Sequence, residues 1–135
     1  MKHSLDFSDP ATQASFSPAG IRVFANIMKA WSIEDHDAAL LLGDVPHETY
    51  CALKENSDEA HLGKESLTRI SLAIGIYRAL HTLFSKQLAN QWVKLPNRGS
   101  IFQGLTPLAY MLSHGVEGMY VVRRKLDSDC QAPYL

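Results

Sequence analysis

The longest apolar stripe in the sequence predicts a buried central helix. In the segment "GKESLTRISLAIGIYRALHTLFSKQLANQW", large apolar residues recur at i, i+3, i+7, i+10, i+13 and i+17, namely Leu67, Ile70, Ile74, Tyr77, Leu80 and Phe84. This spacing follows the helical period over several turns. Gly75 lies within the stripe at a cost of about 1 kcal/mol relative to alanine. We therefore expect Gly75 to mark a close approach of another helix.

The rest of the sequence also favours helices, and no segment of any length alternates as a strand requires. Apolar residues recur with helical spacing from Ile21 to Trp31, and Ser32 is a candidate N-cap for the next helix. Thr106 and Pro107 form a strong helix start, as cap and first residue. Further short helices are predicted after Pro46 and over residues 85–93, 107–114 and 116–129. The predicted fold class is all-α.

Length and composition indicate one ordinary domain or two very small helical ones. The chain has 135 residues, of which 46% are hydrophobic, and its formal net charge is −1. This balance excludes a bulk basic protein that coats nucleic acid, although a local basic face stays possible. No apolar run approaches the roughly 20 residues that cross a bilayer, and the N-terminus lacks an apolar signal region. With two cysteines and no CxxC spacing, we expect reduced thiols and a cytoplasmic protein without membrane contact.

The first 18 residues are predicted to be a flexible N-terminal arm. They are rich in Ser, Asp, Pro, Thr and Gln. Such a segment buries too little apolar area to offset the entropy of ordering. Phe7 and Phe16 are candidate local anchors.

The stretch "AALLLGDVPHETYCALK" has the layout of a helix-turn-helix. A small residue, Ala39, precedes a turn glycine, Gly43, by four positions, and a second short helix follows. In a DNA-binding version, the N-terminal residues of the second helix contact base edges, which makes the candidate contacts His47, Glu48, Thr49 and Lys54. A purely structural pair of helices fits the pattern equally well. The second helix carries Glu48 and Glu55 against a single lysine, so one copy should bind DNA poorly.

No pattern in the sequence predicts a catalytic residue, a metal ligand set or a cofactor site. The run "EDHD" at residues 34–37 collects acidic groups around His36, but consecutive helix positions do not converge on one ion. The six histidines show no HExxH spacing, and no GxSxG motif is present. Cys51 is interpreted as a packing residue. We therefore expect a protein that is not an enzyme.

Four blocks of the sequence together resemble the Xre/MbcA/ParS family of type II antitoxins. They are "WSIEDHDAALLLG…ETYCALKEN", "LTRISLAIGIYRALHTLF", "W…PN…F.GLTPLAYMLSHG" and a last helix with "VVRRKLD". The resemblance runs from about Ile21 to Asp127, and the second half carries its most specific elements. One departure is a turn from Gly43 to Tyr50 that is one residue longer than the family's usual "LG-x-S-x-x-T-Y", which affects the pose of the second helix.

The resemblance implies a two-part antitoxin. Residues 19–84 would form an Xre-like helix-turn-helix that dimerises and binds the operon's promoter, and residues 85–135 would form a small helical toxin-binding domain. The implied partner is a RES-domain toxin that consumes NAD or transfers ADP-ribose from it, encoded by a neighbouring gene. The antitoxin would cover the toxin's active site and would need no cofactor. The alternative is a stand-alone helix-turn-helix transcriptional regulator.

Within that frame, residue types enriched at interfaces identify a candidate toxin-binding surface. Its members lie after the "PNRGSIFQGLTPL" entry segment, in which Phe102 is expected to pack inward and Gly104 to permit a turn. The candidates are Tyr110, His114, Met119, Tyr120, Arg123, Arg124, Asp127, Tyr134 and Leu135. A further hypothesis places the acidic tail, expected to be extended, in the electropositive NAD pocket of the toxin.

Overall fold

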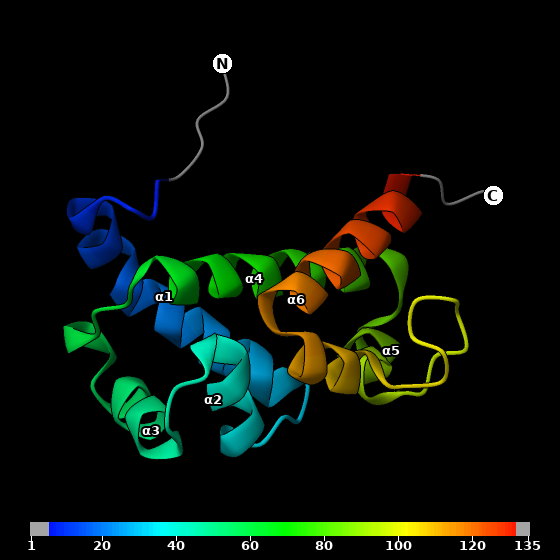
Figure 1. The fold of residues 1–135 in the computed structure, drawn as a ribbon, viewed down its shortest axis with the longest axis horizontal. Coiled ribbons are helices and arrows are strands. Elements are labelled where there is room, and N and C mark those ends of the chain that lie inside the picture. The colour runs from blue at the N-terminus through cyan, green and yellow to red at the C-terminus, as the bar shows by residue number, and fades with distance from the viewer. Residues whose placement is uncertain (1–5, 132–135) are drawn as a thin grey trace.

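The protein is described by a computed structural model over residues 6–131 (Figure 1). Within this range it is all-helical and contains no β-strand, so the all-α prediction is confirmed. The α-helices are α1 (Pro10–Ala30), α2 (Asp35–Gly43), α3 (His47–Glu55), α4 (Lys64–Leu83), α5 (Lys86–Gln91) and α6 (Pro107–Gln131). Two 3₁₀ helices, η1 (Ser57–Glu59) and η2 (Trp92–Lys94), complete the order. No helix of the described range is long and apolar enough to cross a membrane.

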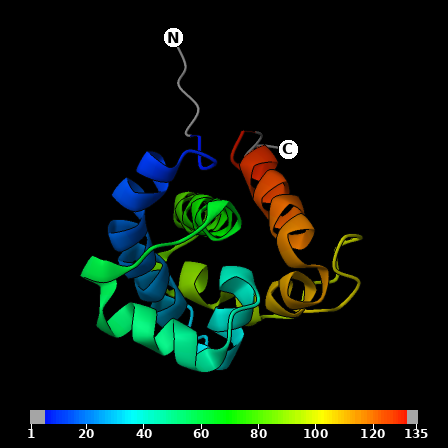
Figure 2. The same ribbon diagram turned by 60° about the vertical axis from the view of Figure 1, so that its left-hand side comes forward.

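The central helix is α4, as the apolar stripe predicted. Figure 2 shows it end-on between α1 and α6, and α2 also packs against it. Its stripe residues Leu67, Ile70 and Leu80 are buried. Burial extends beyond the stripe to Leu72, Ala73, Ile76 and Ala79, because neighbouring helices cover α4 from several sides.

Helix α1 begins earlier than the sequence predicted. It starts at Pro10, and the side chain of its N-cap Asp9 accepts a hydrogen bond from the backbone N–H of Thr12 at 3.0 Å. The predicted flexible arm is therefore wrong for residues 10–18. A contact of Ser17 helps to fix this segment in place. Its hydroxyl is fully buried and accepts a hydrogen bond from the backbone N–H of Leu62 at 2.8 Å. Residues 1–5 of that arm lie outside the described range.

The turn between α2 and α3 depends on two residues with positive φ. Gly43 has φ 145°, and Asp44, not the glycine, is the left-handed cap at φ 63°. The backbone N–H of Asp44 donates to Leu40 O at 3.1 Å and that of Val45 to Ala39 O at 3.2 Å, which satisfies the free carbonyls of α2. The N-cap position of α2 is Glu34, whose side chain makes no capping hydrogen bond, and not the predicted Ser32, which adopts φ 57° in the preceding turn.

Helix α6 consists of two parts that meet at Gly115. This glycine has φ 64° and ψ −143°, so the prediction that it ends a helix is confirmed, although a second helical part follows directly. The predicted Thr106 cap is also confirmed, because its hydroxyl accepts the backbone N–H of Ala109 at 3.0 Å. The second part continues to Gln131, so the tail predicted as extended is helical at Cys130 and Gln131.

Gly75 allows α6 to pack closely on α4, as its position in the stripe predicted. A Cβ placed on Gly75 would overlap the guanidinium group of Arg123, which lies across this point of α4. The helices of residues 19–84 and 85–135 thus share one hydrophobic core, to which α1, α2, α4 and α6 all contribute. The division of these two segments by function stays a prediction.

We expect Gly43→Ala to lower the free energy of unfolding by about 1–3 kcal/mol, because alanine rarely adopts a φ of 145°. An added Cβ would also lie 2.9 Å from the Ser66 hydroxyl. Urea unfolding followed by circular dichroism measures the change. Gly63→Ala is the control, because a Cβ at Gly63 meets nothing within 4 Å and its φ of −83° suits alanine; since Gly63 is the N-cap of α4, its effect should be nonzero but below about 1 kcal/mol. Equal effects of the two substitutions would contradict this account of the turn.

Candidate functional site

The predicted DNA-contacting residues lie on α3, and three of the four face solvent. His47, Glu48 and Thr49 are exposed in the first turn of the helix. Tyr50 points inward: it is buried and meets Phe24 of α1 edge-to-face, with ring centroids 6.1 Å apart. The first turn of α3 is therefore held against α1 while its outer face stays open.

Lys54 is already engaged within the chain. Its Nζ lies 2.7 Å from Asp35 Oδ1 at the start of α2 and 4.9 Å from the centroid of the Tyr50 ring. The hydrogen bond from Lys54 lowers the pKa of the Asp35 carboxyl. A phosphate contact by Lys54 would have to replace this ion pair.

The exposed face of α3 therefore carries little positive charge that could contact DNA phosphates. Glu48 and Glu55 are exposed, while the lysine is paired. Elsewhere, Arg22 pairs with Asp58 at 2.9 Å. Arg69 is only 8% exposed and binds Glu65 and the carbonyl of Leu41, so it supplies no basic surface. This charge distribution disfavours tight DNA binding by a single copy.

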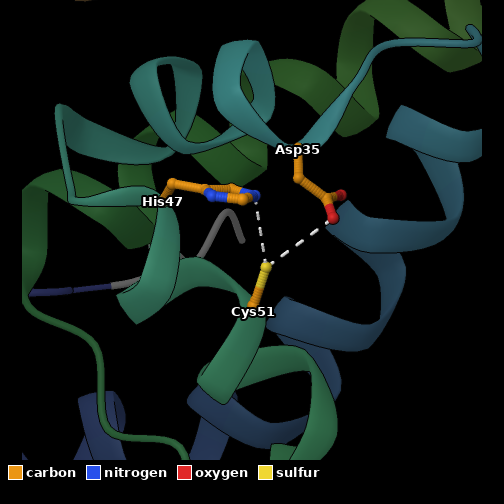
Figure 3. A group of neighbouring side chains, drawn as sticks. All are labelled: Asp35, His47 and Cys51. Carbon is orange, nitrogen blue, oxygen red and sulfur yellow. Dashed lines mark hydrogen bonds between the residues drawn. The ribbon is translucent and has the colours of Figure 1, made fainter.

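Three chemically different side chains meet between α2 and α3 (Figure 3). The Sγ atom of Cys51 lies 3.5 Å from Nε2 of His47, one helical turn earlier, and 3.7 Å from Oδ2 of Asp35. Burial, and then the charge of Asp35, raise the pKa of the Cys51 thiol. In a catalytic Cys–His–Asp arrangement, the histidine lies between the other two groups and activates the sulfur. Here the sulfur lies between His47 and Asp35, and its raised pKa favours the protonated thiol.

The predicted toxin-binding residues are divided by the packing of α6. Tyr120 is 38% exposed, and His114 and Arg124 are also exposed, whereas Tyr110 is half-buried. Met119 is buried at 2% exposure, so its prediction as a surface contact is wrong: it lies on the face of α6 that packs into the core. Tyr134 and Leu135 lie outside the described residues.

Two ion pairs form on the second part of α6, and the candidates Arg123 and Asp127 make up one of them. Arg123 Nε lies 2.9 Å from Asp127 Oδ2, and Lys125 Nζ lies 2.8 Å from Asp129 Oδ2. Each pair is spaced i, i+4 and stabilises the last turns of the helix. Because Arg123 also lies across Gly75, Arg124 is the α6 arginine with the more open side chain.

The loop over residues 95–106 exposes apolar side chains that the sequence analysis did not select. Leu95, Ile101 and Leu105 are 41%, 37% and 47% exposed. The loop is nevertheless ordered by its own backbone, because Asn97 N donates to Leu105 O at 3.1 Å and Gly104 N donates to Asn97 O at 2.7 Å. Figure 1 shows it, in yellow, extending from the helical body before α6. The exposed aliphatic side chains on this ordered loop make it a candidate binding surface.

A row of aromatic rings fixes this loop to α6. Phe102, buried as predicted, meets Trp92 of η2 with ring centroids 6.0 Å apart and Tyr110 of α6 at 5.3 Å. Tyr110 in turn stacks on His114 at 4.2 Å, next to the break at Gly115. Gly104 has φ 93°, which confirms its predicted place in the turn. The sequence predicted that Phe102 packs inward, but it did not indicate that Ile101 and Leu105, on either side of it, are exposed.

The chain matches no protein-family model, and its comparison with curated proteins finds no match. The resemblance to the antitoxin family therefore rests on the residues quoted from the sequence.

We expect Asp35→Asn to speed the alkylation of Cys51 by iodoacetamide at pH 8. The negative charge of Asp35 raises the thiol pKa, so its removal lowers that pKa and increases the thiolate fraction. The parent protein and the Asp35→Asn variant both carry Cys130→Ser, which leaves Cys51 as the one cysteine of the chain.

Asp37→Asn is the matched control for this measurement, because Asp37 also lies in the first turn of α2 but pairs with His36. Its alkylation rate should equal that of the parent. An Asp35→Asn rate no faster than the control would contradict the assigned contact.

Proposed function

We propose that the protein is an antitoxin that binds and neutralises a NAD-consuming RES-type toxin by covering its active site. The observation that carries this proposal is the ordered loop over residues 95–106, which presents Leu95, Ile101 and Leu105 to solvent beside α6. A surface of this kind suits a protein partner, since exposed aliphatic groups gain free energy when they are covered.

The second part of α6 extends this surface. Its exposed residues follow a helical stripe, which consists of Glu117, Tyr120, Arg124, Ser128 and Gln131. Tyrosine and arginine are the residue types that most often dominate binding energy. We infer that Tyr120 and Arg124 contact the toxin, together with the loop, while Arg123 and Asp127 hold α6 on α4.

The proposal assigns neutralisation to coverage of the toxin rather than to chemistry by this chain. The candidate tail carboxylates Asp127 and Asp129 are engaged by Arg123 and Lys125. A tail that enters an electropositive NAD pocket would have to exchange these internal partners for groups of the toxin. Binding through the loop and the Tyr120 stripe requires no exchange of internal ion pairs, so we prefer these residues as the contact with the toxin.

DNA binding is a second proposed activity, and it rests on α2 and α3. The two helices pack with a short turn, and His47, Glu48 and Thr49 are open at the N-terminus of the second helix. The acidic face of α3 favours binding as a homodimer or within the toxin complex, where further positive charge can join the interface. Regulation of the operon's own promoter would then depend on formation of the homodimer or of the toxin complex. The alternative of a stand-alone regulator would require promoter binding without a partner.

We expect Leu105→Asp to weaken the toxin complex by about 100-fold, because a charge would be buried in an apolar contact. Tyr120→Ala should weaken it by at least about 10-fold. The toxin gene beside this one is co-expressed with each variant, growth and cellular NAD are followed, and affinity is measured on the purified proteins.

Val23→Asp is the control for these variants, because Val23 is 40% exposed and lies on α1, away from the loop. It should neutralise the toxin like the unchanged chain. Full neutralisation by both Leu105→Asp and Tyr120→Ala would overturn the assigned surface. A harmless neighbouring gene product that does not co-purify would overturn the antitoxin proposal itself.

We expect Glu48→Gln to raise the affinity for promoter DNA several-fold if α3 enters the major groove. The substitution removes a negative charge from the first turn, where it repels phosphates. Electrophoretic mobility shifts at a fixed salt concentration measure the change. Glu117→Gln on α6 makes the same charge change elsewhere and serves as control. Equal affinities for the two variants would exclude α3 as the DNA-contacting helix.

A further inference from the structure

We propose that Asp35, His47 and Cys51 form a binding site for a zinc ion that joins α2 to α3. The three side chains offer one oxygen, one nitrogen and one sulfur ligand, and these atoms all lie within 4.8 Å of one another (Figure 3). Oxygen, imidazole nitrogen and thiolate sulfur are the three ligand types that zinc takes from proteins.

The two separations that involve the Cys51 sulfur fit a tetrahedral ion. With a Zn–S bond of about 2.3 Å and Zn–N or Zn–O bonds of about 2.0–2.1 Å, tetrahedral angles place the sulfur about 3.5–3.6 Å from each neighbouring ligand atom. The Cys51 sulfur lies 3.5 Å from His47 Nε2 and 3.7 Å from Asp35 Oδ2. Both distances to the sulfur fit the ion, and the His47 nitrogen and the Asp35 oxygen, which lie within 4.8 Å of each other, would come to about 3.3–3.4 Å around it.

The sequence positions of the ligands support the arrangement. His47 and Cys51 are spaced i, i+4 on α3, so they lie on one face a single turn apart. Asp35 is the first residue of α2, and the turn at residues 44–46 brings that helix beside α3. A metal there would fix the relative position of the two helices.

Lys54 occupies one oxygen of the carboxylate and leaves the other for the ion. Its Nζ binds Asp35 Oδ1 at 2.7 Å, whereas Asp35 Oδ2 faces the sulfur. Outer groups that bind a ligand carboxylate orient it toward a metal. The thiol proton that Cys51 now directs at Asp35 would be released on binding, which makes the affinity fall as the pH is lowered.

The ligand set also predicts which ions bind. A thiolate with one imidazole favours Zn²⁺ and its spectroscopic substitute Co²⁺, and disfavours Mg²⁺ and Ca²⁺, which require oxygen ligands. Three protein ligands leave a fourth position for water. Because His47 is also a proposed DNA contact, bound zinc would withdraw its Nε2 from that role.

The test is a titration of the full chain, first stripped with EDTA, by Co²⁺ and then Zn²⁺. We expect one Co²⁺ per chain with a near-ultraviolet thiolate-to-cobalt absorption that Zn²⁺ removes. Cys51→Ser and His47→Ala should abolish the absorption and weaken Zn²⁺ binding by at least about 100-fold, since loss of an outer-shell partner alone costs about 10–100-fold. Far-ultraviolet circular dichroism confirms that these exposed or half-buried substitutions leave the helices intact.

Two controls separate this site from others on the chain. Cys130→Ser removes the other free thiol, and His36→Ala removes the histidine of the exposed Glu34–His36–Asp37 group. Both should retain the absorption and the affinity. An absent thiolate absorption, one that persists in Cys51→Ser, or one that disappears in Cys130→Ser would overturn the proposal. So would zinc binding that depends on His36 alone.

Discussion

Helix α4 lies at the centre of the fold, and its neighbouring helices are arranged so as to bury it. This helix carries apolar side chains on several faces, so it can be stable only when α1, α2 and α6 cover it. Gly75 removes a side chain where α6 crosses, and Arg123 occupies that space. The position of α6, and with it the direction of the Tyr120 stripe, follows from this contact.

The position of α6 in turn fixes the loop at residues 95–106, which precedes it. Tyr110 on α6 contacts Phe102, and Phe102 contacts Trp92 of η2, so the loop is attached at both of its ends. Its backbone hydrogen bonds then turn Ile101 and Leu105 outward. The proposed toxin-binding surface is thus a pre-formed shape, which lowers the entropy lost on binding. On α3, the pairing of Lys54 with Asp35 and the exposed glutamates argue that the proposed DNA binding would be weak for a single copy of the chain.

Periodicity and cap residues predicted much of this fold. The stripe from Leu67 to Phe84 identified α4, and Thr106 with Pro107 located the start of α6, because these signals are local. The early start of α1 was missed because Ser17 is ordered by a hydrogen bond from Leu62, which is distant in sequence. Met119 and Tyr120 are adjacent, and only the packing of α6 on the core decides that the first is buried and the second exposed. Likewise, Asp35 meets Cys51 and His47 through the turn at residues 44–46, a proximity that sequence spacing does not reveal.

The proposed toxin-binding surface is best tested by hydrogen–deuterium exchange of the chain, measured alone and with the toxin proposed to be encoded by the neighbouring gene. We expect slower exchange in the complex at residues 95–106 and in the second part of α6, with α3 unchanged when DNA is absent. Slower exchange confined to α2 and α3, with the loop and α6 unaffected, would contradict this assignment.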